Sequence, residues 1–102
     1  MSKKLTWSVF ASVVLLLLSN VTVAAGDVAA GKEKATPCAS CHGADGQGTD
    51  PKTKITGLSV EKFKAAIQAY KNGERNHAMM QMFAKKLSDQ DVEDLAAYYA
   101  TK

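Results

Sequence analysis

The first part of the chain is an apolar run between a short positive start and a small, polar end. Residues 5–18 are almost wholly apolar, Lys3 and Lys4 precede them, and residues 19–25 end in Val-Ala-Ala. This order is typical of a secretory signal peptide. The run is also short for a membrane span, which needs about 20 residues. We therefore expect residues 1–25 to be a cleaved signal and residues 26–102 to form the folded domain, with an uncleaved anchor as the alternative.

Two later segments repeat their apolar residues at helical spacing. The first stripe consists of Val60, Phe63, Ile67 and Tyr70, and the second of Val92, Leu95, Ala96 and Tyr99. Ser59 is a good N-cap for the first helix, and Gly73 is placed to end it. Ser88 and Asp91 form the start signal of the second, an N-cap followed by an acidic residue three positions later.

A shorter helix is expected over residues 27–36, which are rich in Ala and Lys. Asp27 is its candidate N-cap, and Pro37 should stop it just before Cys38. Residues 74–87 read as irregular or weakly helical, and no segment alternates as a strand does. The sequence thus predicts an all-α domain of three main helices, with Gly31 allowing the first and last helices to cross against Leu95 and Tyr98.

A loop of fifteen residues, 43–57, separates the first helix from the next and holds four glycines and Pro51. Loops of this length in a compact domain are usually functional or packed against something. The 77 residues from 26 to 102 can bury little apolar surface, and domains this small often need a disulfide, a metal or a cofactor. With Lys3 and Lys4 removed, eleven of the thirteen basic residues remain against ten acidic ones, so the net charge is near +1. No run of basic residues is long enough to suggest nucleic-acid binding.

The only two cysteines, Cys38 and Cys41, stand three positions apart and His42 follows them directly. A disulfide across so short a loop would stabilise little. A thioredoxin-like pair needs a βαβ context, which is missing. Zinc wants four ligands, and only His77 remains to join these three. Attachment of a c-type haem through Cys-x-x-Cys-His is favoured, because two thiols can bond its vinyl groups and the histidine can then bind the iron.

At this point the sequence resembles the class I cytochromes c, and in particular small bacterial periplasmic carriers similar to one half of a dihaem cytochrome c. The resemblance rests on residues 38–46, on Gly31, on the loop 46–51, on residues 70–75, on Met80 and on residues 87–91 leading into 96–99. It covers nearly all of residues 26–102. It implies a small all-α fold wrapped around one covalent haem c, with iron as its metal.

The same resemblance implies a sixth iron ligand. In related cytochromes the ligand methionine lies seven residues before the leucine that precedes Ser-Asp-Gln-Asp, and that position is Met80. Met79, Met82 and His77 remain alternatives, and methionines are also common core filler. A ligating histidine usually donates its second ring N–H to a carbonyl. In this family that carbonyl belongs to a loop proline, which implies Pro51, although Pro51 can equally be an ordinary turn residue.

The function implied is a periplasmic electron carrier rather than an enzyme. Its partners would be redox proteins, with a quinol-oxidising complex or dehydrogenase as donor and a terminal oxidase or reductase as acceptor. Scattered surface lysines can steer weak docking onto acidic partners or simply keep the protein soluble. The rivals are an enzyme or gas sensor with an open haem site, a subunit of a larger oxidoreductase, and a non-haem redox or zinc protein. We expect a monomer that does not stay inserted in a membrane.

Overall fold

The computed structural model describes residues 23–102, which contain five helices and no strand. The helices are α1 (Val28–Lys34), α2 (Thr36–His42), α3 (Val60–Lys71), α4 (Ala78–Lys85) and α5 (Asp89–Tyr99). The expected signal peptide lies almost wholly outside the described residues. The all-α prediction is confirmed, and none of the described helices is long and apolar enough to cross a membrane.

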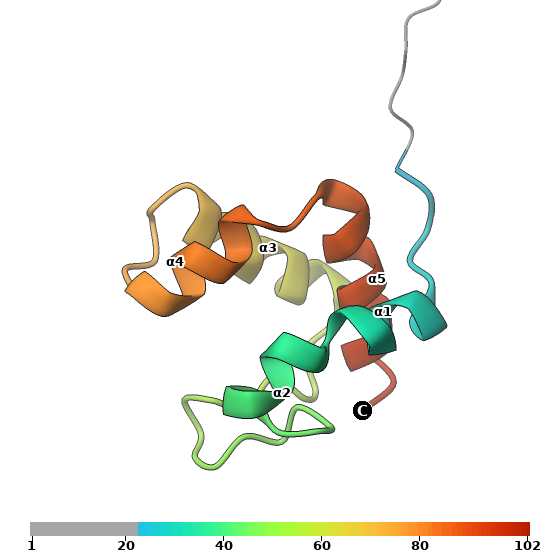
Figure 1. The fold of residues 1–102 in the computed structure, drawn as a ribbon, viewed down its shortest axis with the longest axis horizontal. Coiled ribbons are helices and arrows are strands. Elements are labelled where there is room, and N and C mark those ends of the chain that lie inside the picture. The colour runs from blue at the N-terminus through green and yellow to red at the C-terminus, as the bar shows by residue number, and fades with distance from the viewer. Residues whose placement is uncertain (1–22) are drawn as a thin grey trace, which may run out of the picture.

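The packing follows from the apolar stripes. Helix α5 contacts both α1 and α3, α4 packs on α3, and α2 continues from α1. Figure 1 shows α3 between α4 and α5. The buried core joins side chains from α3, α4 and α5, with Ala35 at the bend between α1 and α2. It includes the α3 residues Phe63 and Ile67 and the α5 residues Leu95 and Tyr99, as the helical spacing predicts.

The expected helix starts are confirmed by their hydrogen bonds. Asp27 Oδ1 accepts from the amide of Ala30, and Ser59 Oγ accepts from that of Lys62. Ser88 and Asp91 form a reciprocal capping box, in which each side chain accepts from the other's backbone N–H. These bonds satisfy amides that the first turn of a helix leaves without partners.

Two expectations about local structure are wrong. Pro37 does not end the helical region, because α2 begins at Thr36 and places this proline in its first turn. A proline is tolerated there, since the first amides of a helix need no intrahelical acceptor. Residues 78–85 form the regular helix α4, although residues 74–87 were expected to be irregular or only weakly helical. Because α2 covers Thr36–His42, the cysteine motif lies on a helix.

Helices α1 and α5 cross at Gly31. A Cβ at this position would lie 2.0 Å from the carbonyl oxygen of Asp94 and 2.7 Å from Cβ of Tyr98. The close crossing is therefore confirmed, with Asp94 rather than Leu95 beside Tyr98 at the contact. Because α2 follows α1 after one residue, this crossing also fixes where the cysteine motif begins.

A buried carboxylate reinforces the same crossing. Asp94 is 3% exposed, and its carboxylate accepts hydrogen bonds from the amide of Asp27 (2.8 Å), Lys34 Nζ (2.5 Å) and Gln90 Nε2 (3.0 Å). The amide of Asp27, followed by Lys34 and Gln90, lowers the pKa of Asp94 to about 2. Lys34 also pairs with Asp91 at 2.9 Å. Asp94 is thus satisfied as an anion that ties the start of α1 to α5.

Candidate functional site

Helix α2 presents the two cysteines differently. Cys38 is half-buried and packs against the core, whereas Cys41, one turn further along, is exposed, and the two form no disulfide with each other. Burial raises the pKa of the Cys38 thiol, because the charged thiolate loses solvation there. The pair therefore lies at the border between the core and solvent, with one sulfur on each side.

His42 ends α2 and is held by the loop that follows. Its Nδ1 lies 2.6 Å from the carbonyl oxygen of Thr53. A carbonyl can only accept, so Nδ1 must carry the proton, which leaves the lone pair of Nε2 free to bind a metal in the neutral ring. The amide of Gly48 also donates to the carbonyl of His42 at 2.7 Å. The ring orientation and tautomer thus suit an axial iron ligand.

The carbonyl beside His42 is not the one expected. Pro51 is exposed and occupies the second position of a turn from Asp50 to Thr53, closed by the amide of Thr53 on the carbonyl of Asp50 at 3.1 Å. Proline favours this position because its φ is already suited to it. The expectation for Pro51 as the histidine's partner is therefore wrong, and its alternative reading as a turn proline is correct. The turn instead places the carbonyl of Thr53, two residues after Pro51, beside the ring of His42.

Among the methionines on α4, the structure distinguishes Met80 from its neighbours. Met80 is half-buried and packs against the core, while Met79 is 52% and Met82 is 45% exposed. His77 is exposed and caps α4, with Nδ1 accepting from the amide of Met80 at 3.3 Å. Of these four candidates, only Met80 directs its side chain to the core that also receives Cys38.

Tyr99 carries an unpaired polar atom in this core. The residue is 1% exposed, its ring stacks on Phe63 with centroids 5.6 Å apart, and its hydroxyl has no hydrogen-bond partner among the described residues. Burial raises the pKa of Tyr99, and the neighbouring Cys38 adds to that effect. A buried hydroxyl without a partner is costly. Its place beside Cys38 fits a site that accepts a further group between the core and α2.

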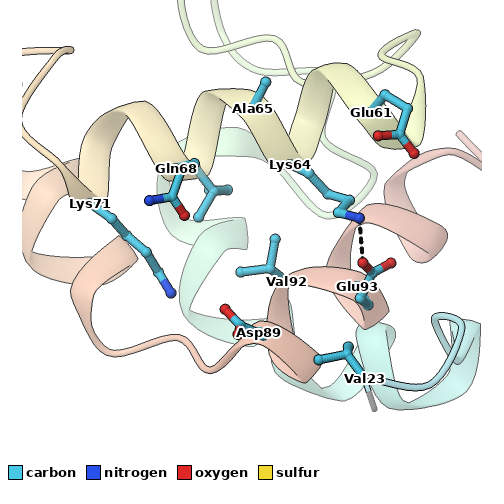
Figure 2. Close-up of a pocket in the computed structure, with 10 residues that line it drawn as sticks. Val23, Glu61, Lys64, Ala65, Gln68, Lys71, Asp89, Val92 and Glu93 are labelled. Carbon is cyan, nitrogen blue, oxygen red and sulfur yellow. Dashed lines mark ion pairs between the residues drawn. The ribbon is translucent and has the colours of Figure 1, made fainter. Parts of the chain in front are cut away.

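Other chemistry finds less support in residues 23–102. Residues 23–102 contain no group of three or more His, Cys, Asp and Glu side chains placed to hold a metal ion. One pocket of that region, about 460 Å³, lies between α3 and α5 (Figure 2). Lys64 crosses its rim to pair with Glu93, as Figure 2 shows. None of its lining residues belongs to α2 or α4, so this pocket is not part of the site.

Sequence reasoning missed two residues of the site. Thr53 acts through its backbone carbonyl, an atom that every residue has, so residue type alone gives no signal for it. Tyr99 was recognised as part of an apolar stripe, and the stripe predicts its burial but not the lack of a hydrogen-bond partner. The loop residues from Asp50 to Thr53 carry a turn signal that could have shifted attention past Pro51.

Comparison with known proteins gives consistent results. A family described as cytochrome c oxidase, cbb3-type, subunit III matches residues 27–98. Cytochrome c-554(548) of Halomonas halodenitrificans is 45% identical over 82 residues, which cover 76% of this chain and 99% of that protein. Cytochrome c4 of Pseudomonas aeruginosa is 40% identical over 86 residues, covering 83% of this chain and 43% of that protein.

A solved structure agrees with these sequence relatives. The crystal structure of reduced recombinant cytochrome c4 from Pseudomonas stutzeri matches with a TM-score of 0.69 at 34% identity, over 76% of this chain and 46% of that one. The chain thus spans nearly all of one relative but less than half of each of these two cytochrome c4 chains.

Proposed function

The chain belongs to the class I cytochrome c family, whose members carry covalently bound haem c, and we propose that it is a periplasmic electron carrier with His42 and Met80 as axial iron ligands. Haem-based electron transfer follows from the family itself. When bound, the haem supplies a one-electron couple between Fe(II) and Fe(III). The proposal concerns which residues of this chain hold it and where the carrier works.

Each site residue has one role in this proposal. Cys38 and Cys41 hold the haem through thioether bonds, one sulfur from the edge of the core and one from the surface. His42 binds the iron through Nε2, while the carbonyl of Thr53 keeps the proton on Nδ1. Met80, which packs against the core from the half-buried side of α4, would supply the second axial ligand.

The observation that carries the proposal is the inward orientation of Met80 together with the fixed tautomer of His42. A strong sixth ligand closes the iron to exogenous molecules and favours electron transfer over gas binding or oxygen chemistry. This supports a carrier over an enzyme or sensor with an open site. The thioether is a soft ligand, which suits a carrier of high potential.

The cellular setting extends the proposal. We infer that residues 1–25 are a cleaved signal, that residues 26–102 are the mature domain and that the domain is a monomer in the periplasm. The match of the family to residues 27–98 supports this boundary. The partners are redox proteins: a quinol-oxidising complex or dehydrogenase gives the electron, and a terminal oxidase or reductase takes it.

Optical spectra of protein produced with the haem-attachment machinery test the ligand assignment. We expect a c-type reduced spectrum and, in the oxidised protein, the weak near-red band that marks a bond between sulfur and iron(III). Met80→Ala should remove this band. Met82→Ala, a matched change at an exposed methionine of the same helix, should leave it intact. A band that survives in Met80→Ala would overturn the assignment.

A further inference from the structure

The loop after the cysteine motif contains a compact hydrogen-bonded turn centred on the side chain of Thr53. Its Oγ1 accepts from the amides of Thr49 (3.0 Å) and Asp50 (3.3 Å) and donates to the carbonyl of Asp50 (3.2 Å). The hydroxyl of Thr53 therefore makes all three of its possible hydrogen bonds, two as acceptor and one as donor, with the consecutive residues Thr49 and Asp50. The hydroxyl fixes Thr53 relative to the chain that precedes it.

The carboxylate of Asp50 fixes the same turn from its other side. Its Oδ1 accepts from the amides of Lys52 (2.7 Å) and Thr53 (3.1 Å). Hydrogen bonds from two amides to one carboxylate oxygen form an Asx-type turn, which holds the backbone without help from a helix or strand. Thr53 is thus restrained through its amide and its hydroxyl, and its carbonyl is free to accept a hydrogen bond from outside the turn.

Gly48 allows the turn to close against His42. Its φ is +67°, and a Cβ there would lie 2.6 Å from both the carbonyl carbon and Oγ1 of Thr53. Its amide donates to the carbonyl of His42 at 2.7 Å, while the ring of His42 donates to the carbonyl of Thr53 at 2.6 Å. Backbone and ring of the histidine are therefore both bound to one turn.

We propose that Thr53 is a positioning residue whose hydroxyl holds the carbonyl of this residue on Nδ1 of His42 and thereby sets the reduction equilibrium of the iron. The inference rests on the proposed function, because it takes His42 as an iron ligand. A well-placed acceptor on the second ring nitrogen raises the basicity of a ligating histidine. A more basic ligand favours Fe(III), so a loosened carbonyl favours Fe(II).

Thr53→Val is the direct test, because valine keeps the shape and removes the hydroxyl. In the haem-loaded protein we expect the equilibrium constant for reduction to rise by about threefold to tenfold, the upper value corresponding to about 59 mV for one electron. NMR of the same protein should show faster solvent exchange of the Nδ1 proton of His42. Thr53→Ser keeps the hydroxyl and should match the wild type in both measurements.

Thr49→Val is the matched control, since it makes the same chemical change in the same exposed loop at a side chain that has no hydrogen bond in residues 23–102. It should leave the potential and the proton exchange unchanged. Asp50→Ala provides a second variant should Thr53→Val not load haem. It removes the Oδ1 acceptor and should shift the potential in the same direction, by less.

Equal potentials in Thr53→Val and Thr49→Val would overturn the inference, as would a Thr53→Ser variant that behaves like Thr53→Val. In both cases the wild type would still show a one-electron couple with His42 bound, so the proposed function would stand. A wild type that carries haem but lacks a reversible couple would instead overturn the proposed function and this inference with it.

Discussion

The crossing of α1 and α5 gives a prediction in which two physical effects have opposite signs. Replacing glycine by alanine inside a helix normally stabilises it, by up to about 1 kcal/mol. At Gly31 the added Cβ would lie 2.0 Å from the carbonyl oxygen of Asp94 and 2.7 Å from Cβ of Tyr98. Overpacking of this kind costs about 1–3 kcal/mol. Since the nearest atom belongs to the backbone, it cannot rotate away, and α1 must move.

We therefore expect Gly31→Ala to lower the free energy of unfolding by up to about 2 kcal/mol after the helix-propensity gain is subtracted. For a domain of this size that corresponds to a melting temperature lower by up to roughly 16 °C. Thermal melts of the haem-loaded protein, followed by far-UV circular dichroism, measure it. Ala29→Gly, at an exposed site on the same helix, isolates the propensity effect and should cost about 1 kcal/mol. A Gly31→Ala variant that melts higher than the wild type would refute the crossing.

Two further predictions concern buried polar groups. The pKa of Asp94 is lowered to about 2 from an ordinary value of 3.8, so this carboxylate contributes stability that is present above 3.8 and lost as the pH falls through 2. The melting temperature of Asp94→Asn should accordingly depend less on pH than that of the wild type in this window. Parallel plots of melting temperature against pH would contradict a stabilising role for the ionised Asp94 carboxylate. The hydroxyl of Tyr98 donates to the carbonyl of Ala44 at 3.3 Å, whereas that of Tyr99 has no partner among the described residues. Tyr98→Phe should therefore lower the free energy of unfolding by about 1 kcal/mol, and Tyr99→Phe should lower it by less, as compared by thermal melts. The reverse order would show that the Tyr99 hydroxyl has a strong hydrogen-bond partner in the haem-loaded protein.

The elements that could be predicted from the sequence are those with strong local signals. The caps at Asp27, Ser59 and Ser88 and the apolar stripes of α3 and α5 fix three helices, because side-chain hydrogen bonds and helical spacing act over a few residues. Helices α1, α2 and α4 are all only seven or eight residues long, and of these only α1 begins after a residue type, Asp27, that commonly caps helices. Isolated helices so short are marginal, and packing rather than propensity decides whether they form.

The site divides in the same way. The spacing of Cys38, Cys41 and His42 is itself the chemical signal for haem attachment, so the motif could be recognised without a structure. The acceptor for the ring of His42 could not, because it depends on where the turn from Asp50 points the carbonyl of Thr53. The orientation of Met80 toward the core, with its neighbours exposed, likewise depends on how α4 packs on α3.

Carbon monoxide binding to the reduced, haem-loaded protein tests the central claim most directly. If His42 and Met80 close both axial positions, the wild-type spectrum should not change when the gas is added at neutral pH, because no coordination site is open. Met80→Ala should bind the gas at once and give the spectrum of a ferrous carbonyl. Rapid binding by the wild type, at a rate equal to that of Met80→Ala, would contradict a closed electron carrier and favour a protein with an open haem site.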